Sequence, residues 1–406
     1  MKKNKVIILG SHLNALSMTQ IFGKEGIPVD VIADTKDQAG RSKYSKWIKS
    51  PNPIASPNEF KTFLIAYCKK QENKPVIIPS MDQWAYLLAQ CELEEKGLAY
   101  TVVDNLETLT LLLNKDKFNN YCEEKGFSIP KIFSIATFNT IPTSSFPLIA
   151  KPNFRMSPDQ NETEESLSKE VNKYRLRKFK TKEELNLFIE KTPKRILNLL
   201  VLQEYISGNS DCMITYGVYC ENGKILGDFE GRKVRGYPHD YGDCMVGKQE
   251  KIPDFIKTES EQLLKAISYN GIAEVEYKID DLKKTCHLIE INPRSWSWVG
   301  ITQYTRHNLP ILAYHSKLGL PLSENKYEVK EREIYFRRRT YDRFNCVYRY
   351  KKTFPKWSMS AKNWKKSFEG KFVYDIESAH KDYIQWVYTF LKNNFILYVN
   401  WFIRNK

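Results

Sequence analysis

Three side chains have the chemistry of a magnesium site. Glu276 lies in an apolar segment at residues 272–279, and Glu290 and Asn292 lie in a second one at residues 285–292. A short polar stretch separates the two segments, which predicts a hairpin of two β-strands. Side chains alternate between the faces of a strand, so Glu290 and Asn292 share a face, and the hairpin can bring Glu276 opposite them. Two carboxylates and an amide oxygen are hard ligands that suit Mg²⁺.

Basic residues lie where they can serve a phosphate group. Lys115 precedes a predicted helix at residues 116–125, and Lys151 ends a short apolar strand. A lysine in such a position offers a point charge to phosphate, although most lysines are simply solvated. An alternative to the metal site is that Arg294 or a lysine simply neutralises the two carboxylates.

The elements that must position these residues begin with a regular alternation over residues 5–110. Strands are predicted at residues 6–10, 29–33, 76–79 and 100–103, and helices at residues 14–25, 58–70 and 82–96. This order predicts a parallel sheet with helices on its faces. Ligands of such sheets gather beyond the carboxyl ends of the strands, which here are Gly10, Asp34 and residues 79–82.

The pattern becomes mixed after residue 114. Further helices are predicted at residues 116–125, 181–191 and 256–270, and strands at residues 146–152, 199–206 and on either side of a turn at 221–224. The polar, acidic stretch at residues 153–169 has no apolar periodicity and is predicted to be a mobile loop. These elements lead into the hairpin that carries Glu276 and Glu290.

Five motifs in this order resemble those of the ATP-grasp enzymes. They are Asn114–Phe118, Phe146–Pro152, Gln203–Gly208, Glu276 and Glu290–Arg294. The resemblance implies an α/β protein whose ATP-grasp part is α+β. Its implied parts are a Rossmann-like pre-ATP-grasp domain at 1–110, a two-lobed ATP-grasp domain at 111–321 with a lid subdomain near 130–203, and a basic aromatic extension at 322–406.

The resemblance also implies where a nucleotide binds. Lys115 and Lys151 would contact the α- and β-phosphates of ATP. The adenine would lie against Gln203 and against the backbone of the segment that follows it, and a carboxylate farther on would hold the ribose hydroxyls. The residues implied for the adenine and the ribose are Gln203, Glu204, Tyr205, Ile206 and Asp211.

The reacting end of the nucleotide has its own set of residues in this resemblance. Two Mg²⁺ ions, for which Mn²⁺ can substitute, would be held by Glu276, Glu290 and Asn292. Arg294 would steady the γ-phosphate and an acyl phosphate. Two neighbouring bases, Arg232 and Lys233, add positive charge nearby; we expect Lys233 to contact phosphate and Arg232 to bind a substrate carboxylate.

One motif departs from the family pattern. The family usually has a Gly-rich loop after its second lysine, whereas this chain has Asn153-Phe154-Arg155-Met156-Ser157-Pro158. Arg155 would take over part of that loop's function.

Within the family, Asn292–Trp298 most resembles the carboxylate–amine ligases that include D-aspartate ligase. The activity implied is the formation of an amide or peptide bond from a small carboxylate and an amine through an acyl phosphate, with an amino acid as one substrate. Trp296 and Trp298 fit either an acceptor pocket or simple packing. Two other functions stay open: a non-catalytic ATP-binding protein, and a ligase fold that acts mainly at the membrane surface.

Composition and charge indicate the number of domains, the cellular compartment and the kind of partner. A length of 406 residues predicts two or three domains, and eight cysteines without a CxxC pair predict reduced thiols in the cytoplasm. The net charge is +15, and from residue 331 onward there are 17 Lys and Arg against 7 Asp and Glu. The basic, aromatic stretch at residues 383–403 fits a helix lying on an anionic membrane or packing onto the ligase body. Nucleic acid is disfavoured as a partner, and a homodimer is compatible with the sequence.

Overall fold

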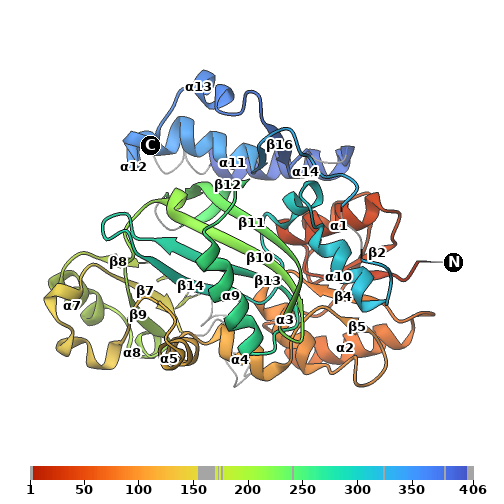
Figure 1. Cartoon of the computed structure of the whole chain (residues 1–406), viewed down its shortest axis with the longest axis horizontal. Helices are drawn as coiled ribbons and strands as arrows, with labels where there is room; N and C mark the ends of the chain where they lie inside the picture. The colour runs from red at the N-terminus through yellow and green to blue at the C-terminus, as the bar shows by residue number, and fades with distance from the viewer. Residues whose placement is uncertain are drawn as a thin grey trace.

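The computed structural model describes residues 3–153, 170–171, 173–174, 177–239, 242–322, 325–378 and 381–399. Within this part of the chain, three β-sheets organise the molecule: a five-stranded parallel sheet, a four-stranded sheet and a seven-stranded sheet (Figure 1). The predicted mixed α/β class is confirmed. Nearly all of the predicted loop at 153–169, with Arg155, lies outside the described residues, as does the end of the predicted C-terminal helix.

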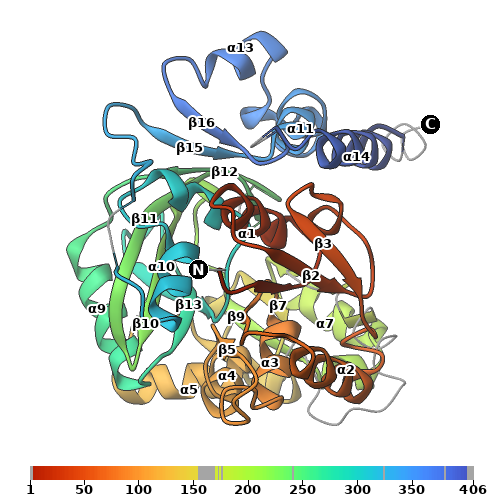
Figure 2. The same ribbon diagram turned by 90° about the vertical axis from the view of Figure 1, so that its right-hand side faces the viewer.

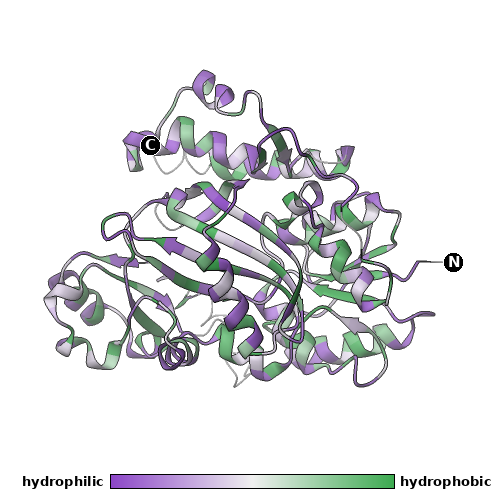
Figure 3. Cartoon of the chain, viewed as in Figure 1, coloured by the Kyte–Doolittle hydropathy of each residue, from purple (hydrophilic) through white to green (hydrophobic). Residues whose placement is uncertain are grey.

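The five-stranded sheet forms because short apolar segments alternate with helices that cover them. Its order is β3 (Ser45–Lys49), β2 (Val29–Ala33), β1 (Val6–Leu9), β4 (Val76–Pro79) and β5 (Tyr100–Thr101), all parallel. Helix α1 (Leu13–Lys24) packs on one face, and α2 (Pro57–Lys69) and α3 (Asp82–Gln90) pack on the other. The central strands are fully buried, and Figure 3 shows their hydrophobic character. The predicted parallel sheet is therefore present.

Helix α4 (Leu106–Leu113) and helix α5 (Lys115–Lys125) lead into the four-stranded sheet. The side chain of Asn114 accepts a hydrogen bond from the backbone N–H of Lys117 and so caps the start of α5. The sheet is antiparallel, in the order β6 (Ile132–Ser134), β9 (Leu200–Glu204), β7 (Leu148–Pro152) and β8 (Arg177–Phe179). Helices α7 (Lys182–Lys191) and α8 (Lys194–Leu197) share its hydrophobic core.

The seven-stranded sheet is the largest layer. Its order is β14 (Cys286–Asn292), β13 (Gly271–Ile279), β10 (Met213–Glu221), β11 (Lys224–Tyr237), β12 (Asp243–Gln249), β15 (Ile334–Arg337) and β16 (Phe372–Asp375). All neighbours are antiparallel except β15 and β16. Helix α9 (Asp254–Ala266) packs on one face, and α10 (Leu309–Lys317) belongs to the core that the sheet shares with the five-stranded sheet.

The C-terminal extension packs onto the body of the molecule, which is one of the two arrangements expected for it. Strands β15 and β16 lengthen the seven-stranded sheet, and helices α11 (Arg339–Phe344), α12 (Tyr350–Thr353), α13 (Ala361–Lys366) and α14 (Tyr383–Asn394) form a layer at its end (Figure 2). A π-helical turn, Phe395–Val399, follows α14. Among the described residues, no helix combines the length and the apolar character needed to cross a membrane.

A buried ion pair joins this layer to the sheet. The guanidinium of Arg235 on β11 donates two hydrogen bonds, of 2.7 and 2.8 Å, to the carboxylate of Asp342 on α11. The indole N–H of Trp364 donates to the same carboxylate at 2.6 Å. Burial opposes the charge of Arg235, but Asp342 outweighs burial and raises the pKa of the guanidinium.

Candidate functional site

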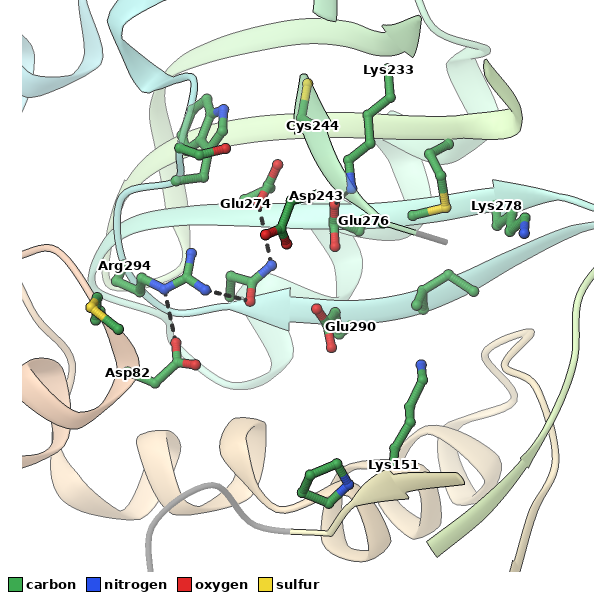
Figure 4. A pocket seen from close by; sticks show the side chains of 18 of the residues that line it. Asp82, Lys151, Lys233, Asp243, Cys244, Glu274, Glu276, Lys278, Glu290 and Arg294 are labelled. Carbon is green, nitrogen blue, oxygen red and sulfur yellow. Dashed lines mark hydrogen bonds and ion pairs between the residues drawn. The ribbon is translucent and has the colours of Figure 1, made fainter. Parts of the chain in front are cut away.

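A cavity of about 670 Å³ lies where the three sheets meet (Figure 4). The seven-stranded sheet forms one wall with side chains of β11, β13 and β14, and the four-stranded sheet faces it with Lys151 and Gln203. The carboxyl ends of β1 and β4 add His12, Met81 and Asp82. Ligands of parallel sheets gather at this edge of a sheet, as the sequence predicts.

Strands β13 and β14 form the expected antiparallel hairpin and set a row of acidic groups into the cavity. Glu276 lies directly opposite Glu290 in the register, and Glu274 lies opposite Asn292. Because side chains alternate, Glu274, Glu276 and Lys278 face the cavity together from β13. The amide N–H of Asn292 donates to Glu274 at 3.2 Å, and the Thr215 hydroxyl donates to the other oxygen of the same carboxylate.

Two lysines compensate this negative charge. Nζ of Lys233 lies 2.5 Å from a carboxylate oxygen of Glu276, and Nζ of Lys115 lies 3.3 Å from Glu290. Burial alone would lower the pKa of Lys233, but the carboxylates of Glu276 and Glu274 outweigh it and raise the pKa above its ordinary value. Burial, together with the like charge of Glu276, raises the pKa of Glu274. The site therefore brings basic and acidic side chains together, with Lys233 and Glu276 more deeply buried than Lys115 and Glu290.

The donor chemistry of the hairpin fits a magnesium ion. Carboxylates directly opposite each other on paired strands repel, so Glu276 and Glu290 require a cation. The lysines supply that charge here, which is the simpler interpretation offered by the sequence. Among the described residues, no group of three His, Cys, Asp or Glu side chains is placed to hold a metal ion. Two carboxylates and an amide suit Mg²⁺ only when phosphate oxygens complete its coordination.

Arg294 is held in place from both ends of its guanidinium. Its Nε donates to Oδ1 of Asp82 at 2.8 Å, and its Nη2 donates to Oδ1 of Asn292 at 3.0 Å (Figure 4). Asp82 begins α3 in the N-terminal part of the chain, 212 residues away in sequence, and its side chain is 6% exposed. An aspartate at the start of α3 thus fixes the direction of an arginine that follows β14.

We expect Asp82→Asn to lower kcat by about 10- to 100-fold, because a misplaced charged group loses its alignment with the reacting atoms. The KM for ATP should change little, since the residues expected to hold the nucleotide lie on other elements. Steady-state ADP release separates the two constants.

Glu94→Gln is the matched control for Asp82→Asn. Glu94 also pairs across the same two parts of the chain, with Lys317 on α10 at 2.9 Å, but it is not in the cavity wall. Equal losses of kcat in both variants would contradict a positioning role for Asp82.

The residues expected to bind the adenine lie together at one end of the cavity. Gln203 and Glu204 end β9, and Tyr205 and Ile206 follow in the segment that leads to the large sheet. Backbone bonds fix this segment: the N–H of Glu204 donates to Lys131 at 2.8 Å, and the N–H of Tyr205 donates to Pro147 at 3.1 Å. Lys151 projects toward Glu290 from the facing strand β7 (Figure 4).

Two expected residues lie outside the cavity wall. Arg232 is adjacent to Lys233 on β11, and alternation turns it to the other face of the sheet. There it donates to Glu250 at 2.7 Å and to the backbone carbonyl of Asp211 at 2.9 Å. The carboxylate of Asp211 is on an exposed residue of a short 3₁₀ turn. The expectation that Arg232 binds a substrate carboxylate and Asp211 binds ribose therefore has no support in this geometry.

Other residues of the cavity were not predicted from the sequence. Glu274 and Lys278 lie two positions on either side of Glu276, so strand alternation was a signal that could have found them. Arg338 enters the cavity from the C-terminal extension, which matched no motif. Trp296 and Trp298 line the cavity while 1% exposed, and Trp298 packs edge-on against Phe229. These two tryptophans are packing residues that also shape a wall.

Comparison with protein-family models and with curated protein sequences gives no match. Solved structures do match. An L-amino acid ligase from Bacillus licheniformis is 14% identical with a TM-score of 0.58, and the match covers 80% of this chain and 76% of that one. N5-carboxyaminoimidazole synthetase from Staphylococcus aureus, complexed with ADP, is 15% identical with a TM-score of 0.57, covering 82% of each chain.

A phosphoribosylglycinamide synthetase from Anaerococcus prevotii is 13% identical with a TM-score of 0.53, covering 78% of this chain and 76% of that one. At these identities the likeness concerns the fold. The chain has the ATP-grasp fold, and the expected resemblance is confirmed at that level.

Proposed function

We propose that this protein is an ATP-dependent ligase that forms a C–N bond between a carboxylate and an amine, one of them an amino acid. The observation that supports this most is a convergence in one cavity. Two carboxylates and an amide of the hairpin, from Glu276, Glu290 and Asn292, line the cavity together with Lys233 of the same sheet and Lys151 of the four-stranded sheet. The likeness of the fold to an L-amino acid ligase supports an amino acid as a substrate.

In this proposal the nucleotide spans the cavity from β9 to the hairpin. Gln203 and the backbone that follows it receive the adenine, and Lys115 and Lys151 bind phosphate oxygens. Glu276, Glu290 and Asn292 would hold Mg²⁺, which would neutralise the negative charge of the phosphates when bound. We also propose that residues 130–203, which include most of the four-stranded sheet, serve as the lid of the site.

Arg294 and Lys233 act at the reacting atoms in this scheme. The substrate carboxylate attacks the γ-phosphorus of ATP, ADP leaves, and an acyl phosphate forms. The amine then attacks the acyl carbon and phosphate departs, so one ATP gives ADP and phosphate for each bond made. Positioned cations of this kind stabilise the spreading negative charge of phosphoryl transfer with little reorganisation.

The test is ADP and phosphate release by the purified protein with ATP and Mg²⁺, measured against pairs of amino acids. Release that rises only with a particular pair, with a product of the mass of the condensed pair, supports the ligase. ATP binding without release for any amino-acid pair would contradict it and favour a non-catalytic ATP-binding protein. Lys151→Met should weaken ATP binding, whereas Lys251→Met, at an exposed position outside the cavity wall, should not.

A further inference from the structure

Helix α14 has its polar side buried and its apolar side exposed. Gln385, Thr389 and Asn393, spaced four residues apart, are at most 4% exposed. Large hydrophobic side chains on the outer side are far more accessible, among them Ile384 at 70% and Leu391 at 61%. A surface helix normally turns its apolar face to the core, so this orientation is the reverse of the usual one.

Polar contacts fix that orientation. Thr389 accepts hydrogen bonds from Gln385 at 2.6 Å and from Gln38 of the N-terminal part at 3.3 Å. The amide of Asn393 donates to Glu377 at 3.3 Å. A rotation of α14 that hid its apolar side would expose or break these buried bonds.

The exposed apolar side is continuous over about four helical turns. It runs from α14 into the π-helical turn and comprises Tyr383, Ile384, Trp386, Val387, Phe390, Leu391, Phe395, Ile396 and Val399. We call these nine residues the outer face. Part of it borders a shallow hollow lined by Leu391, Phe395, Ile396 and Val399. A contiguous apolar surface of this kind marks an interaction site.

The charges around the outer face are positive. Arg41 lies over the ring of Tyr388, 4.2 Å from its centroid. The backbone N–H of Lys43 donates to Asp382 at the start of α14. Arg41 and Lys43 are both exposed. Lys381 precedes the helix and is also exposed, and Arg343 on α11 acts electrostatically on Tyr398.

The acidic groups in contact with α14 are compensated or buried. Asp37 pairs with Lys392 at 2.7 Å, and Asp382 and Glu377 are 2% and 5% exposed. The cations therefore face solvent while the anions face the protein. This arrangement complements a negatively charged surface.

We propose that the outer face binds the surface of an anionic lipid bilayer, with α14 lying in the plane of the headgroups. Aromatic and aliphatic side chains would enter the boundary between headgroups and acyl chains, and the four exposed cations would contact lipid phosphates. Figure 2 shows α14 at the edge of the molecule beside α11. The helix would lie on the bilayer because it is too short to cross it.

The test is flotation of the full chain with vesicles of phosphatidylcholine alone and with about 30 mol% phosphatidylglycerol. We expect binding at least about tenfold stronger to the anionic vesicles, and weaker binding in about 1 M NaCl, where headgroup charge is screened. The triple variant Ile384→Ser, Leu391→Ser, Phe395→Ser should lose binding by about tenfold or more.

The matched control replaces three exposed hydrophobic residues elsewhere, Leu187, Phe255 and Leu282, by serine. This control should bind vesicles as the unchanged chain does. ATP binding without vesicles should be the same in all variants, because the outer face contributes nothing to the cavity wall. Flotation requires no catalysis, so its outcome is independent of the proposed ligase activity.

Three results would overturn the proposal: no binding to anionic vesicles, equal binding of the triple variant, or equal binding to both kinds of vesicle. Light scattering of the chain in solution tests whether a second copy of the chain covers the outer face instead. A dimer in solution that the triple variant dissociates would show that a second copy of the chain covers the outer face.

Discussion

Replacing Glu276 by glutamine is expected to lower the rate of ADP release by about 10³-fold, with the protein still folded. The change keeps the shape of the side chain and removes its charge. Glu276 stands opposite Glu290 and 2.5 Å from Lys233, so it touches both the proposed ion site and a proposed phosphate contact. Without the carboxylate, the buried Lys233 loses its nearest counter-charge, and Glu290 is the one carboxylate of the proposed ion site that is left for Mg²⁺.

Two controls separate chemistry from folding in this experiment. Asp281→Asn removes a carboxylate from the turn of the same hairpin, where the side chain is exposed and outside the cavity wall; it should leave the rate unchanged. Thermal unfolding should remain a single cooperative transition in both variants. A rate for Glu276→Gln within about tenfold of the unchanged protein would remove this residue from the proposed mechanism.

The second large effect is on stability. We expect Asp342→Ala to lower the free energy of unfolding by about 3–5 kcal/mol, because it leaves the buried guanidinium of Arg235 without its counter-charge. The indole N–H of Trp364 loses its acceptor as well. Urea unfolding followed by tryptophan fluorescence measures the change, and Glu369→Ala, at an exposed position of the same extension, is the control.

A double variant shows how much of this cost comes from the orphaned charge. Arg235→Met with Asp342→Leu replaces the pair by apolar groups of similar size and should recover most of the lost stability. A loss below about 1 kcal/mol for Asp342→Ala would mean that water or another acceptor reaches Arg235.

The sequence carried enough information for the hairpin and for the parallel sheet. Alternating apolar residues around Glu276 and Glu290 predicted paired strands, and these strands are present as β13 and β14. Strand β3 was not predicted because its five residues are only partly buried and form no apolar run. Helix α4 was not predicted because eight residues give too short a period to recognise.

The cavity was harder to predict than the fold. Neighbours on a strand face opposite ways, and nothing in the local sequence decides that Lys233 rather than Arg232 faces inward. The Asp82–Arg294 pair joins residues 212 positions apart, which no local pattern reports. The reversed orientation of α14 was equally hidden, since periodicity shows that a helix has two faces and burial alone shows which one is inside.

The C-terminal extension contacts both the seven-stranded sheet and the five-stranded sheet. It continues the large sheet through β15, and its last helix is fastened to the first sheet by the Lys392–Asp37 ion pair and by hydrogen bonds from Ser42 and Lys43 to Asp382. The ion pair of Asp82 and Arg294 is a second contact between the same two parts of the molecule.

The five-stranded and the seven-stranded sheets, two of the three sheets around the cavity, are thus held together. If the four-stranded sheet is the lid that we propose, it should move against this fixed pair of sheets when ligands enter and leave, with the C-terminal extension on the side that does not move.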